Sequence, residues 1–284
     1  MNKKLTLSAL LAASLMTAAA AQAEDLKKVG GFKSPESVLA TTTGRVYVSE
    51  IGEFGKDGDG QISVIEKDGS VKPYAIGLDD PKGLALVGNA LYVADKTRVM
   101  KISTNGKVEV FAAAEAFPVK PQFLNDLEAD GIGNLYVSDS GDLAGKGGAI
   151  YRINKNGKVT TVVDGTRNPL VQGPNGLLNG GRGTLLEVDF VSGTLYRVSL
   201  GNGELTKLAE GFGGGDGLVR GIDGMLYVSD WKNGKVYSVD REGKVKLLKE
   251  GFKAAADIAL ATNGKALLVP DMKAGEVVWL PLLK

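Results

Sequence analysis

Histidine and cysteine are both absent from this chain of 284 residues. Without cysteine there can be no disulfide, thiolate metal site, thiol nucleophile or lipidated cysteine. Without histidine, a Ser-His-Asp triad, a histidine general base and a histidine-ligated zinc site are all excluded. Any metal bound by this protein must therefore be held by oxygen ligands.

Long apolar runs are also scarce, and the longest lies at the N-terminus. A basic start (Lys3, Lys4), an apolar stretch (residues 5–15) and the small-x-small sequence Ala21-Gln22-Ala23 are typical of a secretory signal peptide. The stretch is too short for a stable membrane span. We predict cleavage after Ala23, one domain over residues 24–284, and export, with the periplasm favoured over secretion and no membrane span.

Excess charge of either sign is missing as well. Removal of Lys3 and Lys4 with the signal peptide changes the formal net charge from +1 to −1. A nearly neutral chain has no electrostatic attraction for the phosphate backbone, so we do not expect nucleic acid as a partner.

Glycine is abundant, with 40 residues, and it punctuates a repeated pattern. A short strand signature that ends in an acid occurs six times, and a turn and two further strand-like segments follow most copies. The six copies are RVYVSE (45–50), LYVAD (91–95), LYVSD (135–139), TLLEVD (184–189), LYVSD (226–230) and LLVPD (267–271). Four strands per period of about 40–50 residues are typical of a β-propeller blade.

The two ends of the chain complement each other. The segment EVVWLPL (276–282) reads as a third strand with no fourth strand after it. The segment DLKKVGGF (25–32) resembles KLLKEGF (246–252), which stands where a fourth strand leads into the next blade. We therefore predict an all-β, six-bladed propeller with four-stranded antiparallel blades, whose last blade is closed by the N-terminal strand.

The acids that end the second strands are shared by all six copies, which indicates a structural role. We expect these terminal acids to accept backbone N–H groups in the turns that follow. They are Glu50, Asp95, Asp139, Asp189, Asp230 and Asp271.

A second position, about 14 residues before each terminal acid, differs between the copies. It lies where the chain enters the innermost strand, so its six side chains should surround one mouth of the central channel. They are Glu36, Lys82, Asn125, Asn175, Asp216 and Asp257. Convergent carboxylate and amide oxygens are the ligands that hard cations prefer. The alternative is that these groups cap the inner strands and hold channel water.

At these positions the chain resembles the regucalcin/gluconolactonase (senescence marker protein-like) family of propellers and, more distantly, NHL-repeat propellers. The resemblance implies that Glu36 in SPESV, Asn175 in GPNGLL and Asp216 in GGDGLV hold one divalent cation. Ca²⁺ is favoured, with Zn²⁺, Mn²⁺ or Mg²⁺ as alternatives. It also implies that Asn125, in an Asn-Asp dipeptide, contacts the substrate.

The chain departs from the family pattern in two places. Pro35 precedes Glu36 where the family usually has Glu-Gly-Pro, and Gln122, Phe123 and Leu124 stand where its lactonases often carry an arginine. Lys82 adds a cation that either binds an anionic substrate or balances Asp257. The pattern therefore predicts the metal site and leaves sugar-lactone specificity open.

The longest connections should overhang the predicted ring, which marks that face as functional. They span residues 51–60, 112–122, 140–148 and 164–173, and Phe54, Phe117, Phe123 and Trp231 are candidate apolar walls or plain packing residues. The segment GKDGDGQISVIE (55–66), which overlaps the first of these connections, partly fits a calcium loop, although a Gly/Asp-rich turn is the favoured explanation.

These observations lead to two hypotheses about function. The first is a metal-dependent hydrolase of a lactone or related ester, with Asp216 and Asn125 catalytic and Asn125, Lys82 and Asp257 binding substrate. The second is a non-catalytic binding or interaction propeller in the periplasm. The oligomeric state is left open.

Overall fold

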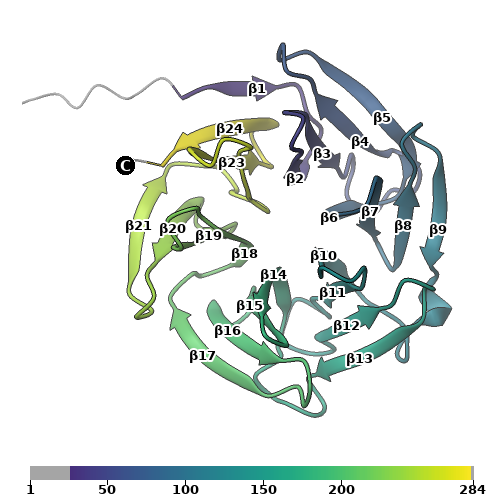
Figure 1. Ribbon diagram of the computed structural model, residues 1–284, viewed down its shortest axis with the longest axis vertical. Coiled ribbons are helices and arrows are strands. Elements are labelled where there is room, and N and C mark those ends of the chain that lie inside the picture. Colours follow the sequence, from purple (N-terminus) through teal and green to yellow (C-terminus); the bar gives the residue numbers. More distant parts are fainter. Residues whose placement is uncertain (1–25, 283–284) are drawn as a thin grey trace, which may run out of the picture.

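Six four-stranded antiparallel sheets surround a central channel in the computed structural model, which describes residues 26–282 (Figure 1). The predicted signal peptide, residues 1–23, lies outside the described residues. The only helical element within them is a 3₁₀ turn, η1 (Ala114–Ala116). None of the helical structure in these residues has the length and hydropathy that a membrane span requires.

Each blade is built from consecutive strands, with the first strand innermost and the fourth outermost. Blades 1 and 2 comprise β2 (Pro35–Ala40), β3 (Val46–Glu50), β4 (Gly60–Ile65), β5 (Val71–Leu78), then β6 (Pro81–Val87), β7 (Ala90–Asp95), β8 (Arg98–Ile102), β9 (Val108–Ala112). Blades 3 and 4 comprise β10 (Leu124–Ala129), β11 (Leu135–Asp139), β12 (Ala149–Ile153), β13 (Val159–Asp164), then β14 (Pro174–Gly181), β15 (Thr184–Asp189), β16 (Thr194–Ser199), β17 (Leu205–Glu210). Blades 5 and 6 comprise β18 (Gly215–Arg220), β19 (Leu226–Asp230), β20 (Lys235–Val239), β21 (Val245–Glu250), then β22 (Ala259–Leu260), β23 (Ala266–Asp271), β24 (Glu276–Pro281) and the N-terminal β1 (Lys28–Gly30).

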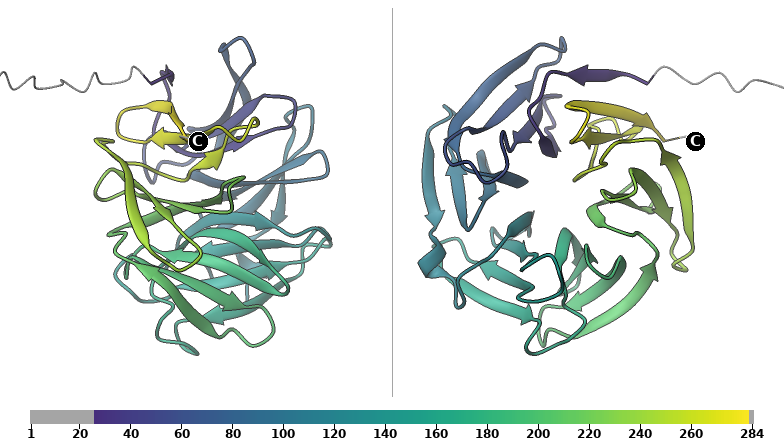
Figure 2. Two further views of the ribbon diagram at one scale, coloured as in Figure 1. Left: turned by 60° about the vertical axis from the view of Figure 1, so that its left-hand side comes forward. Right: turned by 180° about the vertical axis from the view of Figure 1, so that it is seen from behind.

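The predicted closure of the last blade by the N-terminus is confirmed. Val29 of β1 pairs with Val277 of β24, and Figure 2 shows the two ends of the described chain side by side. Phe32, directly after β1, is buried with Val48 of blade 1 and Leu268 of blade 6 in one hydrophobic cluster. The first and last blades are therefore joined by both hydrogen bonds and apolar packing.

The apolar second strands are explained by burial on both faces. Val137 of β11 packs in a cluster between blades 2 and 3, whereas its neighbour Tyr136 packs between blades 3 and 4. Because each blade is covered by a blade on either side, its second strand reads as a continuous apolar run rather than an alternating one. Six such clusters fill the six spaces between neighbouring blades.

The terminal acids hold the entries of the inner strands, which extends their predicted role. Asp139 accepts the N–H of Gly141 in the following turn, as expected, and also those of Gln122 and Phe123, at 3.0, 3.0 and 2.8 Å. Every one of the six acids accepts at least one backbone N–H from the segment that leads into its own inner strand. The acids thereby position the residue that enters the channel a few positions later.

One buried acid breaks the pattern of the core. Glu187 lies two residues before its terminal acid, where the other five blades carry Val48, Val93, Val137, Val228 and Val269, all fully buried. Within the described part of the chain, neither carboxylate oxygen of Glu187 has a hydrogen-bond partner. Burial, and secondarily the nearby Asp189, raises the pKa of Glu187 well above its ordinary value.

We expect Glu187→Val to stabilise the protein, because it removes a buried polar group without a partner. The free energy of unfolding should rise by about 1–2 kcal/mol near pH 7. Above about pH 4.3 the unfolded chain releases the Glu187 proton while the folded chain keeps it, so wild-type stability should fall as pH rises. Urea unfolding between pH 4 and 8 should show the advantage of the variant growing with pH.

Glu187→Gln is the matched control, since glutamine keeps the shape and polarity of the side chain but cannot ionise. It should remove the pH-dependent part of the difference and keep the cost of the buried polar group. A valine variant that is less stable than wild type at pH 7, with an unchanged pH slope, would contradict this account of Glu187.

Candidate functional site

Five side chains enter the channel at the same level, one from each of blades 1–5. Each follows the inner-strand residue that pairs with the terminal acid, as Asn125 follows Leu124, the partner of Asp139. These side chains are Glu36, Lys82, Asn125, Asn175 and Asp216, and all are at most 5% exposed. The structure thus brings five of the six predicted ring residues together around one cavity.

Asp257 is not the sixth member, and the predicted ring is corrected here. In blade 6 Ala255 pairs with Asp271, so the equivalent of Asp216 is Ala256. The hairpin of blade 6 is one residue longer than that of blade 5, which is why counting 14 residues back misplaces the position. Asp257 does not line the cavity; its carboxylate accepts the Ser37 hydroxyl at 2.5 Å, and its N–H donates to the Glu36 carbonyl.

Asp257 belongs to a second layer, one residue deeper in the channel. This layer consists of Ser37, Gly83, Asp126, Gly176, Gly217 and Asp257. Glycine is required here by close approach: a Cβ atom at Gly176 would lie 2.1 Å from the carbonyl oxygen of Asp216, and one at Gly217 would lie 2.3 Å from a backbone nitrogen. The second layer therefore packs backbone against backbone directly beneath the five side chains.

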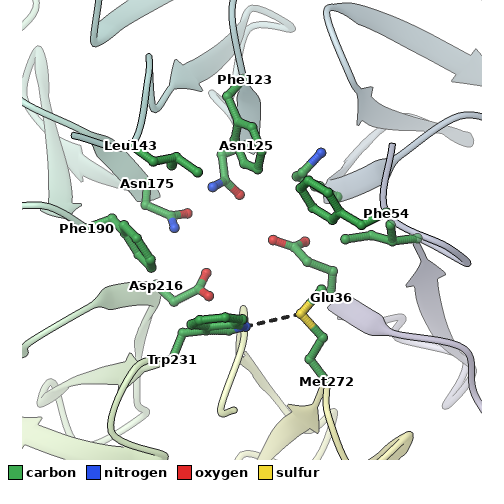
Figure 3. A pocket seen from close by; sticks show the side chains of 12 residues that line it. Glu36, Phe54, Phe123, Asn125, Leu143, Asn175, Phe190, Asp216, Trp231 and Met272 are labelled. Atoms are coloured by element: carbon green, nitrogen blue, oxygen red, sulfur yellow. Dashed lines mark hydrogen bonds between the residues drawn. The ribbon is translucent and has the colours of Figure 1, made fainter. Parts of the chain in front are cut away.

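Three buried oxygen atoms at the cavity lack partners. In the described residues, Glu36 Oε2, Asn175 Oδ1 and Asp216 Oδ1 are buried and accept no hydrogen bond. Figure 3 shows the Glu36 and Asp216 carboxylates and the Asn125 and Asn175 amides pointing into the same space. Unsatisfied buried oxygens are costly, so a group that binds all three would relieve a real conflict.

Burial and neighbouring carboxylates also disfavour the ionised forms of the acids at the cavity. Burial raises the pKa of Glu36 well above its ordinary value, and the charges of Asp216, Asp257 and Asp126 raise it further. Burial and then Asp257 likewise raise the pKa of Asp216, against an opposing hydrogen-bond contribution from Asn175. Burial also raises the pKa of Asp257, to about 7. A divalent cation would favour the ionised form of all these groups.

Lys82 supplies the single positive charge among the cavity-lining residues. Its ammonium donates to the Asp80 carbonyl at 3.1 Å and lies 4.4 Å from the ring centre of Phe123 and 5.7 Å from that of Phe54. Burial lowers its pKa, while Glu36 and Asp80 oppose that shift. Lys82 is therefore a desolvated cation held against aromatic faces, with N–H donors to spare.

The orientation of the Asn125 amide follows from a short hydrogen-bond chain. Asn125 Nδ2 donates to Ser140 Oγ at 3.2 Å, and the Ser140 hydroxyl donates to the Pro174 carbonyl at 2.7 Å. Because the Ser140 hydroxyl is committed as a donor, it accepts from the amide nitrogen. Asn125 Oδ1 is then left to face the cavity, as drawn in Figure 3.

Apolar side chains form the outer part of the cavity, and we call them the apolar wall. They are Ile51, Phe54, Phe123, Leu143, Phe190, Trp231 and Met272. Of the candidates named from the sequence, Phe54, Phe123 and Trp231 belong to the wall. Phe117 does not: it is buried in the core with its ring 5.1 Å from that of Tyr151.

Four members of the wall were missed in the sequence, although a signal for three of them exists. Ile51, Phe190 and Met272 each follow a terminal acid directly, as the correctly named Trp231 does. Ser140, which anchors Asn125, occupies the same position in blade 3. Since the terminal acids lie at the face where the inner strands begin, the residue after an acid can turn toward the cavity, as it does in four blades. Lys96, after Asp95, pairs with Asp57 instead.

The loop at residues 55–66 is a turn followed by a strand. The Asp57 carboxylate pairs with Lys96 and the Glu66 carboxylate with Arg45 at 2.9 Å, so two candidate calcium ligands are engaged with different cations. Strand β4 begins at Gly60, where a calcium loop would continue. More generally, residues 26–282 hold no group of three or more Asp, Glu, His or Cys side chains placed to share a metal. The three unsatisfied cavity oxygens, two carboxylate and one amide, are a donor set of a different kind.

A propeller with a polar cavity at one channel mouth is the class of protein that these observations define. The family model of the SMP-30/gluconolactonase/LRE-like region matches residues 79–270, more than half of the chain, and the protein belongs to this family. The matched region contains Lys82, Asn125, Asn175 and Asp216. Glu36 lies before it. No curated protein matches the chain significantly by sequence.

Solved structures share the fold at low sequence identity. A candidate gluconolactonase from a structural genomics consortium is 17% identical with a TM-score of 0.71, covering 92% of this chain and 95% of its own. The calcium-binding protein regucalcin from Agrobacterium tumefaciens is 19% identical with a TM-score of 0.70, covering 88% and 90%. Virginiamycin B lyase from Staphylococcus aureus is 16% identical with a TM-score of 0.63, covering 91% and 99%.

Asp139→Ala should destabilise the protein, because three N–H groups, in the entry of β10 and in the following turn, lose the buried carboxylate that accepts them. We expect the free energy of unfolding to fall by about 2–4 kcal/mol in urea titrations. Asp142→Ala is a matched control: Asp142 accepts the N–H groups of Ala144 and Lys146, but it is exposed, and water can replace it. Equal losses for the two variants would argue against the proposed role of the terminal acids.

Proposed function

We propose that this protein is a divalent-cation-dependent hydrolase of a lactone or related ester. The observation that carries the proposal is the convergence of three buried oxygens without partners, from Glu36, Asn175 and Asp216, at the mouth of the channel. Membership of the gluconolactonase-like family supports the reaction class. The reaction itself is inferred from the chemistry of the side chains that line the cavity.

The donor set fits a hard cation. Glu36 and Asp216 would contribute one carboxylate oxygen each and Asn175 its amide oxygen. Oxygen-only ligands favour Ca²⁺, with Mn²⁺, Mg²⁺ and Zn²⁺ as alternatives. A cation bound by these three residues would polarise the carbonyl of the substrate as a Lewis acid and stabilise negative charge on its oxygen.

Asp216 is the best placed general base. With Oδ1 directed at the cation, its second oxygen, Oδ2, can take a proton from an attacking water. The water oxygen then bonds to the acyl carbon, the acyl C–O bond breaks, and the proton passes from Asp216 to the departing oxygen. Burial raises the pKa of Asp216 above its ordinary value and a bound cation would lower it again, so the carboxylate would be ionised and able to accept the proton.

Asn125 and Lys82 would orient the substrate. The Ser140 anchor directs Asn125 Oδ1 into the cavity, where it can accept a hydrogen bond from the attacking water or the substrate. Lys82, on the neighbouring inner strand, can donate to an anionic oxygen, because only one of its N–H groups is used by Asp80. Asp257, beneath the floor, would act on the charge of Glu36 and Asp216 rather than touch the substrate.

Two other functions are compatible with this fold. The lyase of Staphylococcus aureus is described as catalytically inactive when one histidine is replaced by alanine. This chain has no histidine, so that chemistry is disfavoured. A non-catalytic binding propeller is the second candidate, favoured by the absence of an arginine before Asn125.

Asp216→Ala should abolish both cation binding and turnover, because one residue supplies a ligand and the base. We expect the Ca²⁺-induced rise in melting temperature to disappear and lactone or aryl ester hydrolysis to fall at least about a hundredfold. Asp68→Ala, at an exposed turn, is the control and should change neither quantity. Full hydrolysis by Asp216→Ala would refute the mechanism. Cation binding by wild-type protein without any turnover would instead support the binding propeller.

Ser140→Ala should slow hydrolysis by releasing the Asn125 amide, while leaving the cation ligands in place. We expect kcat/KM to fall about tenfold with the Ca²⁺-induced thermal shift retained. A double-mutant cycle separates positioning from general damage: in the Asn125→Ala background, Ser140→Ala should have no further effect. Additive losses would show that Ser140 acts independently of Asn125.

A further inference from the structure

The polar and apolar groups of the cavity are separated by depth. The five polar side chains form its floor, and the apolar wall surrounds the space above them. Of the polar atoms, three oxygens belong to the proposed cation site, Asn125 Nδ2 is used by Ser140, and Lys82 already donates to Asp80. The capacity that remains is on the floor, at Asn125 Oδ1 and the free N–H groups of Lys82, whereas the only polar hydrogen of the wall, the Trp231 indole N–H, donates to Met272.

The side chain that could have hydrogen-bonded to a hydroxylated substrate, that of Gln122, lies outside the cavity. Gln122 stands in the segment before the Asn-Asp dipeptide, yet it does not line the cavity. Its side-chain amide lies against Gly147, where a Cβ atom would come within 2.0 Å of Gln122 Nε2. Phe123, the next residue, takes its place at the cavity and stacks with Phe54, with ring centres 5.9 Å apart.

On the opposite side, Trp231 is held firmly as part of the wall. Its indole N–H donates to the Met272 sulfur at 3.1 Å, its ring centre lies 6.2 Å from that of Phe190, and the Lys273 ammonium lies 4.2 Å from it. An apolar group entering the cavity would thus meet aromatic side chains on two sides.

The size of the cavity limits the ligand. Its volume is about 180 Å³. An engineered apolar cavity of about 150 Å³ accommodates one benzene ring. The space above the floor therefore suits one ring of that size rather than an extended chain.

Building on the proposed function, we propose that the substrate is a compact hydrophobic lactone or ester with one aromatic or similarly sized apolar ring, and not a polyhydroxylated sugar lactone. The apolar wall receives the ring while the floor engages the acyl group. Sugar hydroxyls that face the apolar wall would lose water and gain no partners, which discriminates against a polyhydroxylated ligand.

Three six-membered lactones test this directly: dihydrocoumarin, with a fused aromatic ring; δ-valerolactone, with neither an aromatic ring nor hydroxyls; and D-glucono-1,5-lactone, with hydroxyls on the lactone ring. We expect kcat/KM with Ca²⁺, each divided by the rate constant of hydroxide-catalysed hydrolysis, to follow that order. The ratio for dihydrocoumarin should exceed that for gluconolactone at least about a hundredfold. An equal or reversed ratio would overturn the inference while the hydrolase function stands.

Binding is measured separately, with the lactam analogue of dihydrocoumarin, in which N–H replaces the ring oxygen. It should bind in the presence of Ca²⁺ by isothermal titration calorimetry. If the lactam binds and none of the three lactones is hydrolysed, the proposed function fails and the ligand class stands. If neither binding nor hydrolysis of dihydrocoumarin occurs, the inferred substrate class is wrong.

The two tryptophans of the chain provide matched variants, since each has a lysine ammonium over its ring. Trp231→Ala should reduce the kcat/KM for dihydrocoumarin at least tenfold more than that for δ-valerolactone. Trp279→Ala, at blade 6 outside the cavity, should leave the ratio of the two kcat/KM values unchanged.

Phe54→Ser is a second test, at a side chain that is 60% exposed, and Ile132→Ser, at a side chain that is 81% exposed, is its control. Equal effects of both members of each pair would refute the role of the wall.

Discussion

The central constraint on this molecule is the crowding of buried oxygen atoms where the inner strands meet. Glu36, Asn175 and Asp216 each bring an oxygen without a partner to one place, and the one nearby cation, Lys82, is held against two aromatic rings. In the described residues no other lysine or arginine lines the cavity. The ionised carboxylates are therefore unfavourable when no cation is bound. This is what we expect of a site that binds a divalent cation.

The scaffold holds these oxygen atoms close together. Each terminal acid accepts N–H groups from the entry of its own inner strand, and the glycines of the second layer let neighbouring strands approach closely beneath the site. Closure of the last blade by β1 completes the circle, so β2, which carries Glu36, and the segment before β22 that contains Asp257 are fixed next to each other. Because the ring of blades is closed, no site residue stands at a free edge of the propeller.

The repeat made the fold predictable, and the same repeat explains the errors in the site. Six copies of an apolar strand that ends in an acid indicate six blades, since a strand buried between two blades needs no alternation. Counting a fixed 14 residues worked for Asn125 and Asp216 but placed Asp257 in the ring, because hairpin length varies where solvent permits it. Only the pairing register shows that Ala256 holds that place.

The apolar wall and the buried Glu187 were harder to predict from the sequence. Phe190 and Met272 follow terminal acids, but so does Lys96, and no pattern of composition marks which of these residues turns inward. Phe117 lies in a connection predicted to overhang the site, but it packs in the core. Glu187 sits in an apolar strand signature, and its lack of a partner becomes visible only when neighbouring blades are placed beside it.

The most direct test is a crystal structure with Mn²⁺ or Ca²⁺, with the ion located by its anomalous scattering. We predict one ion at the channel mouth, bonded to oxygens of Glu36, Asn175 and Asp216 at about 2.1–2.6 Å. A peak at another position, or an ordered cavity without a peak at saturating cation, would contradict the central claim that these three residues share one cation.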